Sequence, residues 1–142
     1  MIVGKKGWKT DSFIEALDQS PFQSDIRIVG YVARETLVDL YSNAEAFVYP
    51  SLFEGFGLPL VEAMACGCPI ISSNAACLPE IAGPAGLYFS PTSEAQLIAK
   101  LQLVLNSPKK QKELRQLSLQ QAATFSWDKT ARKTLSIFEG LK

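Results

Sequence analysis

The stretch PSLFEGFGLPLVEAMACG, residues 50–67, joins a short apolar run to a helical pattern. The preceding run Ala46–Tyr49 is continuously apolar, as is typical of a buried parallel strand. Pro59 suits the first turn of a helix and Gly67 suits a helix C-terminus, so a helix is predicted over Leu58–Cys66. A strand that leads through a loop into a helix is the repeating unit of an α/β fold.

The same alternation extends to both sides of this stretch. Further strands are predicted at Ile26–Val29, Pro69–Ser72 and Leu87–Phe89, with Ile2–Val3 as a truncated fifth. Helices are predicted between Thr10 and Pro21, over Arg34–Ser42, and, after the last strand, over Ser93–Asn106, Pro108–Phe125 and Trp127–Leu141. We therefore expect a Rossmann-like, doubly wound parallel sheet in a three-layer αβα arrangement, with C-terminal helices and residues 1–142 forming one domain.

Composition and charge exclude several classes of function. Lysine plus arginine and aspartate plus glutamate both number 14, so no net positive field exists to hold a nucleic acid. Histidine is absent, which excludes Ser-His-Asp and Cys-His catalysis within the chain. Cys66 and Cys68 are too closely spaced for a usual zinc knuckle, so buried free thiols are expected, without a metal or other cofactor.

The apolar stretches are short, which predicts no membrane span. Met1-Ile2-Val3 is followed by Gly4 and Lys5 instead of a long apolar run, so no secretory signal is expected. These features favour the cytoplasm, or the cytosolic face of a membrane, as the location.

The loop after the strand at Ala46–Tyr49 has the composition of an anion site. Gly55 and Gly57 carry no side chains, so a ligand can approach the backbone closely. The first amides of the following helix lie at the positive end of its dipole and are expected to be unpaired. A diphosphate would be a suitable ligand. A Gly57→Val change should then block binding, and the variant should fold if Gly57 has a negative φ.

Glu54 and Glu62 flank this loop. Carboxylates repel phosphate, so they are better suited to accept hydrogen bonds from neutral hydroxyl groups. Hydroxyls on both sides of a diphosphate describe a nucleotide sugar. The alternative for an isolated pair is that both are solvated acids and that the glycines only turn the chain.

Several motifs occur together in a fixed order. They are Ile28-Val29-Gly30-Tyr31-Val32, Leu40-Tyr41-Ser42-Asn43-Ala44-Glu45, Phe47-Val48-Tyr49-Pro50-Ser51, the Glu54 to Glu62 segment through Ile71, Leu78-Pro79-Glu80-Ile81 and Phe125-Ser126-Trp127. This series resembles the group 1, or family 4, retaining glycosyltransferases of the two-lobed GT-B architecture. The resemblance implies that the chain is part of the C-terminal, nucleotide-sugar-binding lobe of such an enzyme.

The resemblance also implies roles for individual residues. Glu62 would bind the ribose hydroxyls, and Glu54 would be the catalytic carboxylate beside the transferred sugar. The amides of Phe56, Gly57 and Leu58 would meet sugar hydroxyls and phosphate, and Gly55 would also be a substrate-binding residue. The backbone at Val32 would contact the edge of the base. Transfer in this family is metal-independent and retains the anomeric configuration.

The chain departs from the family pattern at its N-terminal side. The family's C-terminal lobe opens with a further strand and a glycine-containing loop, whose arginine and lysine clamp the diphosphate. Neither cation has a counterpart here, although Lys5 and Lys6 are candidates for contact with the diphosphate or nucleotide. The N-terminal, acceptor-binding lobe is also missing, so we expect the isolated chain to bind a donor without transferring sugar.

Two other hypotheses remain. One is a non-catalytic nucleotide-sugar-binding module or a subunit of a split glycosyltransferase. The other, a flavodoxin-like or receiver-type domain, is disfavoured because it leaves the Glu54 to Glu62 segment unexplained.

Trp8 is expected to pack, and Glu80 is expected to serve as a helix-end charge. Core-facing or strand positions with no role in function are expected for Tyr31, Tyr41 and Tyr49.

Overall fold

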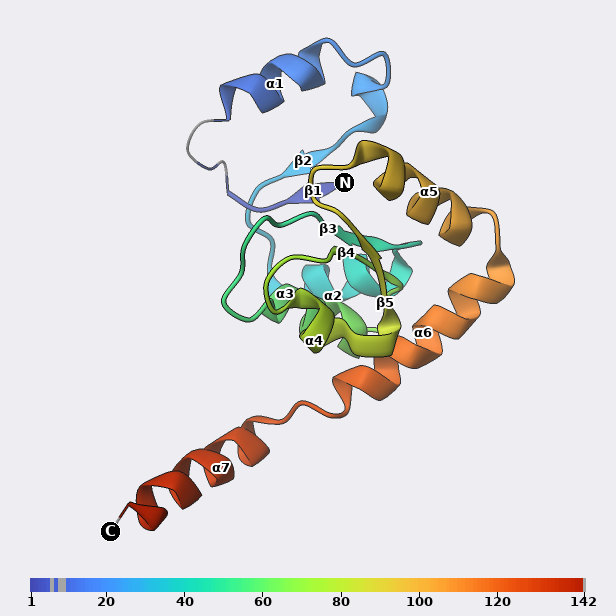
Figure 1. Cartoon of the computed structure of the whole chain (residues 1–142). Coiled ribbons are helices and arrows are strands. Elements are labelled where there is room, and N and C mark those ends of the chain that lie inside the picture. Colours follow the sequence, from blue (N-terminus) through green and yellow to red (C-terminus); the bar gives the residue numbers. More distant parts are fainter. Residues whose placement is uncertain (6, 8–9, 142) are drawn as a thin grey trace. The chain divides into compact units, whose positions relative to one another are not determined.

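A computed structural model describes residues 1–5, 7 and 10–141 of the chain (Figure 1). The chain divides into two compact units, Met1–Leu37 and Val38–Lys142. Helix α2, Arg34–Asn43, spans the boundary between them. Each unit contains its own parallel strands.

The first unit is one strand-helix-strand crossover. β1, Ile2–Val3, pairs in parallel with β2, Ile28–Val29, and Ile2 lies opposite Ile28. Between the strands lie α1, Asp11–Asp18, and the short 3-10 helix η1, Gln23–Asp25. The prediction that these strands are buried is wrong, since both residues of β1 are exposed and Ile28 is 47% exposed. In this unit an apolar run indicates a strand without indicating that it is covered.

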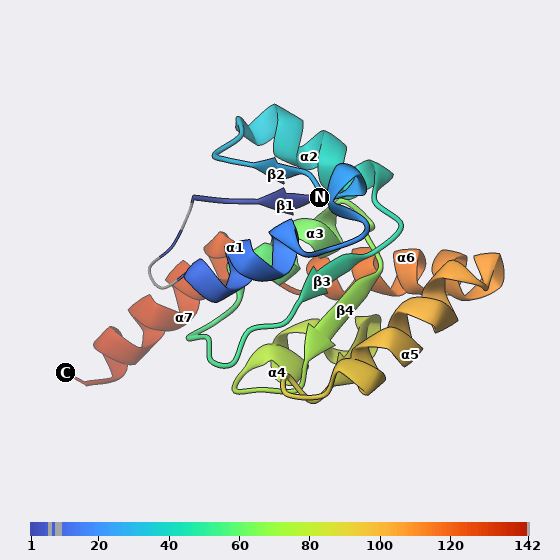
Figure 2. The same ribbon diagram turned by 90° about the horizontal axis from the view of Figure 1, so that it is seen from above.

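The second unit is built on a three-stranded parallel sheet in the order β3-β4-β5, and Figure 2 shows β3 beside β4. These strands are Phe47–Tyr49, Ile70–Ser73 and Gly86–Phe89. All four residues of β4 are buried. Because successive side chains of a strand point to opposite faces, both faces of the sheet are covered at β4.

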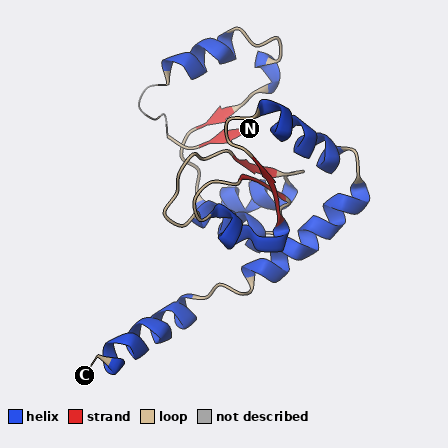
Figure 3. Cartoon of the chain, viewed as in Figure 1, coloured by secondary structure: helices blue, strands red, loops and turns tan. Residues whose placement is uncertain are grey.

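Helices pack against this sheet and against each other (Figure 3). α3, Leu58–Ala65, and α4, Leu78–Ala82, contact β4, and the 3-10 helix η2, Gly83–Ala85, leads into β5. α5, Glu94–Leu105, contacts β4 and β5, while α6, Pro108–Ala122, contacts α3 and α5. One buried hydrophobic cluster contains residues of strands and of helices. Its members are Ile71 of β4, Phe89 of β5, Val104 of α5 and Leu114 of α6.

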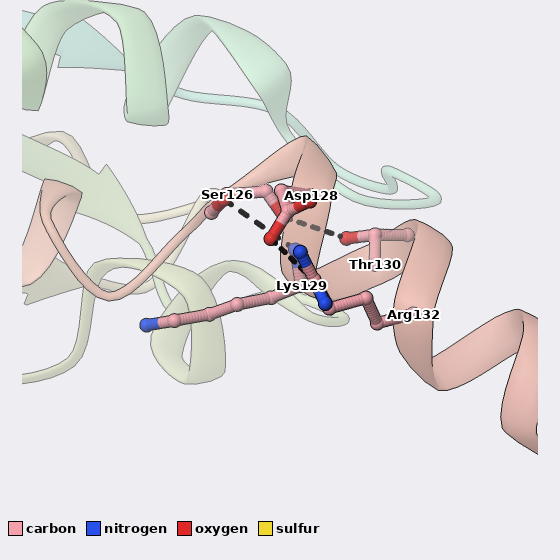
Figure 4. A network of polar contacts seen from close by, with 5 residues as sticks. All are labelled: Ser126, Asp128, Lys129, Thr130 and Arg132. Carbon is pink, nitrogen blue, oxygen red and sulfur yellow. Dashed lines mark hydrogen bonds and ion pairs between the residues drawn. The ribbon is translucent and has the colours of Figure 1, made fainter.

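The last three helices share one type of N-cap. The hydroxyls of Ser93, Ser107 and Ser126 each accept a hydrogen bond from an amide three residues later. Figure 4 shows this cap at the start of α7, Trp127–Gly140, together with the ion pair between Asp128 and Arg132. None of the residues of α7 is buried.

The prediction of an α/β fold with parallel strands and C-terminal helices is confirmed. The structure adds that the strands form two separate sheets, β1-β2 and β3-β4-β5. A single domain over residues 1–142 stays a prediction. Across the described residues, each helix is too short or too polar to traverse a bilayer.

Candidate functional site

The loop between β3 and α3 ends at a left-handed glycine. Gly57 precedes α3 with φ 90° and ψ 46°. A Cβ atom added at Gly57 would lie 2.8 Å from Cδ2 of the buried Leu78. Both the backbone conformation and the packing therefore require glycine at this position. The condition attached to Gly57→Val, a negative φ, is not met, because that variant would strain the fold itself.

Three amides just before α3 and at its first residue make no hydrogen bond to the described residues. The amide of Leu60 donates to the Gly57 carbonyl over 2.9 Å, and Pro59 has no N–H. The amides of Phe56, Gly57 and Leu58 have no acceptor among the described residues. The first turn of α3 therefore has fewer free amides than expected from the sequence. The amides of Phe56, Gly57 and Leu58, which were the predicted ligand contacts, are all free of partners among the described residues.

The loop is fixed to the next strand-helix connection. The buried Ser73 hydroxyl, at the end of β4, donates to the Ser51 carbonyl over 2.6 Å. The thiol of Cys77, the residue before α4, donates to the Glu54 carbonyl over 3.4 Å. These contacts hold the carboxyl ends of β3 and β4 and the Glu54 backbone together.

The Glu54 side chain is held by two hydroxyl groups. The Tyr49 hydroxyl donates to Oε1 of Glu54 over 2.6 Å, and the Ser51 hydroxyl donates to the same oxygen over 2.8 Å. The hydrogen bond from Tyr49, followed by that from Ser51, lowers the pKa of Glu54. Burial, reinforced by the Glu54 hydrogen bond and charge, raises the pKa of Tyr49. Glu54 is therefore a fixed anion at neutral pH.

Glu62 is an exposed residue of α3 and lies in the same unit as Glu54. Its carboxylate has no hydrogen-bond or ion-pair partner in the described part of the chain. Burial, and then the charge of Glu62, raise the pKa of Tyr41 to about 12. The Glu62 carboxylate is thus available for an external donor.

The remaining predicted residues divide between the units. Gly55 lies in the loop, and a Cβ added there would meet no atom within 4 Å, so protein packing does not require glycine. Val32 is half-buried and belongs to the first unit, as does the exposed Lys5. Lys5 lines a hollow of about 190 Å³ beside β1 and α1. Lys6 and Trp8 lie outside the described residues. Glu54, Glu62 and the loop amides all belong to the second unit.

An apolar groove of about 510 Å³ borders the loop. Phe56 and Leu58 line one part of it, and the segment from the end of α6 into α7 lines another. Phe56 and Phe125 meet edge to face with ring centroids 6.0 Å apart. Lys129 and Lys133 supply the cations of its lining.

Several sequence-based interpretations need correction. Tyr49 lies in a strand as predicted, and its hydroxyl contacts Glu54, a contact that the sequence did not predict. Tyr31 is not core-facing, since it is 83% exposed. Of the three free cysteines only Cys68 is fully buried. A tyrosine that ends a strand five residues before an acidic loop residue is a signal that could have suggested this contact.

The described residues contain no cluster of three or more histidine, cysteine, aspartate or glutamate side chains arranged to hold a metal ion. The loop and α3 offer amides, which donate hydrogen bonds, and separate carboxylates, which accept them. This combination suits a ligand that carries both phosphate and hydroxyl groups.

Comparison with known proteins identifies the family of this chain. The family described as glycosyl transferases group 1 matches residues 1–120. O-antigen chain mannosyltransferase B of Escherichia coli is 36% identical over 139 residues, which cover 98% of this chain and 36% of that protein. The chain thus spans about a third of the length of this relative.

Solved structures show the same fold. Sucrose-phosphate synthase from Thermosynechococcus elongatus superposes with a TM-score of 0.84 at 30% identity, covering 98% of this chain and 37% of that one. HepE from Anabaena, determined in complex with UDP, has a TM-score of 0.84 at 18% identity, covering 97% of this chain and 40% of that one. The chain belongs to the group 1 glycosyl transferases.

Proposed function

We propose that this chain binds a nucleotide-sugar donor for glycosyl transfer, at the loop between β3 and α3. One observation carries the proposal. A fixed, ionised Glu54 and three amides without internal acceptors lie in the loop and first residue that lead into α3, and the unpartnered Glu62 lies about one turn further along this helix. This combination provides donors for a diphosphate and acceptors for hydroxyls in one place.

The diphosphate would bind at the amides of Phe56, Gly57 and Leu58, where the helix dipole favours negative charge. Gly55 supports this arrangement because no protein atom needs its small size, whereas a ligand pressed against the backbone would. Glu62 would accept hydrogen bonds from the ribose and Glu54 from the transferred sugar. Val32 and Lys5 stay predicted contacts to base and nucleotide.

The relatives suggest the class of donor. A mannosyltransferase among them supports a hexose, and the UDP complex of a structural neighbour supports a nucleoside diphosphate.

We infer that transfer retains the anomeric configuration and uses no metal ion, with the donor phosphate accepting the acceptor's proton. The lowered pKa of Glu54 fits a hydrogen-bond acceptor better than a general acid. A cytoplasmic location stays a prediction.

A complete transferase is expected to need more than these residues. The chain spans 36% of its mannosyltransferase relative, and sugar transfer requires an acceptor held beside the donor. We therefore propose donor binding without transfer for the isolated chain. The second candidate, a non-catalytic binding module or a subunit of a split transferase, uses the same donor site. Restored transfer on adding a separate acceptor-binding chain would support the split enzyme.

Thermal unfolding with a panel of ligands tests the proposal. A ligand that binds only the folded state raises the unfolding temperature. We expect nucleoside diphosphates and their sugars to stabilise the chain, and nucleosides without phosphate to have no effect. No stabilisation by any nucleoside diphosphate at millimolar concentration would contradict the proposal.

A further inference from the structure

We propose that Tyr49 is a positioning residue that, together with Ser51, occupies one oxygen of Glu54 so that only the other oxygen faces the transferred sugar. The inference rests on the proposed function and extends it by assigning a role to Tyr49. It also defines Glu54 as an acceptor fixed in direction, with no part in proton transfer.

The two hydroxyls converge on a single atom. Tyr49 and Ser51 donate to Oε1 over 2.6 Å and 2.8 Å, respectively. Oε2 has no hydrogen-bond partner in the described part of the chain. An ionised carboxylate accepts through both oxygens, so saturating Oε1 leaves Oε2 for an external hydroxyl. A side chain tied at one oxygen also loses the freedom to rotate.

The backbone beneath Glu54 is held separately from its carboxylate. Ser73 binds the Ser51 carbonyl and Cys77 binds the Glu54 carbonyl, both from the connection after β4. The Tyr49 ring stacks on Phe47 with centroids 5.6 Å apart. A Tyr49→Phe change would keep the ring and these backbone contacts. It should therefore release the carboxylate without releasing the loop.

The titratable groups around Glu54 set the direction of the pH effect. Tyr49 faces it from β3 and Cys77 from the start of α4, while Tyr41 of α2 lies beyond Tyr49. No lysine or arginine pairs with Glu54 among the described residues. Its pKa is lowered by the Tyr49 and Ser51 hydrogen bonds. Removing one donor should raise that pKa, so sugar recognition by the anion should fail at a higher pH in the variant.

A matched control separates this role from loss of any buried tyrosine hydroxyl. The Tyr88 hydroxyl, on β5, donates to the Gly83 carbonyl over 2.6 Å, and burial raises its pKa to about 12. Tyr88→Phe removes the hydroxyl of another half-buried tyrosine, which makes a hydrogen bond of the same length and does not touch Glu54. Ser51→Ala removes the second donor to Oε1 by a different change.

The first measurement needs no ligand. The carboxyl carbon of Glu54 is followed by NMR as pH is lowered in the 142-residue chain. Tyr49→Phe and Ser51→Ala should each move its midpoint to a higher pH, and Tyr88→Phe should not. An unchanged midpoint in Tyr49→Phe would overturn the inference even if nucleotides bind.

The second measurement compares the affinities for UDP or GDP and for the corresponding nucleotide sugars. At neutral pH Tyr49→Phe should reduce the gain in affinity given by the sugar by about tenfold and leave the affinity for the diphosphate unchanged. Glu54→Gln should also reduce that gain, and Tyr88→Phe should keep it. If the parent chain binds no nucleotide, the proposed function fails. If it binds and Tyr49→Phe keeps the full gain, the positioning role alone fails.

Discussion

Glu62 is exposed on α3 and unpartnered in the described chain, so it can be removed without cost to packing. Glu62→Gln should weaken nucleotide binding by about 1.5–3 kcal/mol, because hydrogen bonds to a charged group are worth that much. The free energy of unfolding should change by less than about 0.5 kcal/mol. Calorimetric titration and urea unfolding measure the two effects. Glu80→Gln, an exposed acid on α4, is the matched control. Equal nucleotide affinities in Glu62→Gln and the parent would refute the ribose assignment.

Gly55 and Gly57 separate a role in binding from a role in folding. Gly57→Ala should lower the free energy of unfolding by more than about 1 kcal/mol, since its φ is positive and a Cβ would lie 2.8 Å from Leu78. Gly55→Ala has room and should keep its stability, yet it should lose donor affinity if the diphosphate approaches the backbone. Denaturation and nucleotide titration of both variants provide the check. A Gly55→Ala chain that binds normally would exclude close approach at that residue.

The contacts of individual side chains in the site could be predicted from the sequence only in part. Glu54, Glu62 and the loop amides could be named from the pattern of one loop and one helix. The hydrogen bonds from Tyr49 and Ser51 depend on how the loop folds back on the end of β3. The lack of room for a side chain at Gly57 is due to Leu78, which lies twenty-one positions later in the sequence. Such contacts are tertiary, and local periodicity does not encode them.

Side chains of helix α6 donate hydrogen bonds to carbonyls at the ends of the neighbouring helices α2, α3 and α4. Arg115 donates to the Ala44 carbonyl over 2.7 Å and to the Gly67 carbonyl over 3.3 Å. Ser118 donates to the Cys68 carbonyl over 2.7 Å, and Gln121 donates to the Ile81 carbonyl over 2.9 Å. Side chains of one helix thus satisfy carbonyls at the ends of α2, α3 and α4, which is why α3 is held firmly at the end opposite the loop.

Arg115→Met should therefore destabilise the fold by about 1.5–3 kcal/mol, because it leaves two carbonyls without a charged donor. Arg132→Met is the control. Arg132 pairs with Asp128 on exposed α7, and an exposed pair of this kind contributes at most about 1 kcal/mol. Urea midpoints of both variants test the contrast. Equal losses would mean that the contacts of Arg115 do not brace α3.

The elements themselves could largely be predicted from the sequence. Two strong signals, Pro59 and Gly67, placed the ends of α3 close to their observed positions. The short apolar runs placed every strand. Exposure of β1 and β2 could not be predicted, because an apolar run shows that a strand can be buried without showing what covers it.

For the whole molecule, the expected behaviour is binding without turnover. Donor hydrolysis and transfer to sugar or lipid acceptors should stay at background, because nothing in this part of the relatives' length is expected to orient an acceptor. Adding the N-terminal region of a two-lobed transferase, as one polypeptide or as a separate chain, should restore transfer. Product formation followed by chromatography checks both expectations. Robust transfer by the 142-residue chain alone would show that it holds an acceptor by itself.

The most direct test of the donor site is amide NMR of the 142-residue chain during titration with UDP, GDP and ADP. We expect saturable shifts in the amides of Phe56, Gly57 and Leu58 with at least one diphosphate, and weaker binding of the same diphosphate by Glu62→Gln. Shifts confined to other parts of the chain, or no saturable shift at all, would contradict a donor site at the N-terminus of α3.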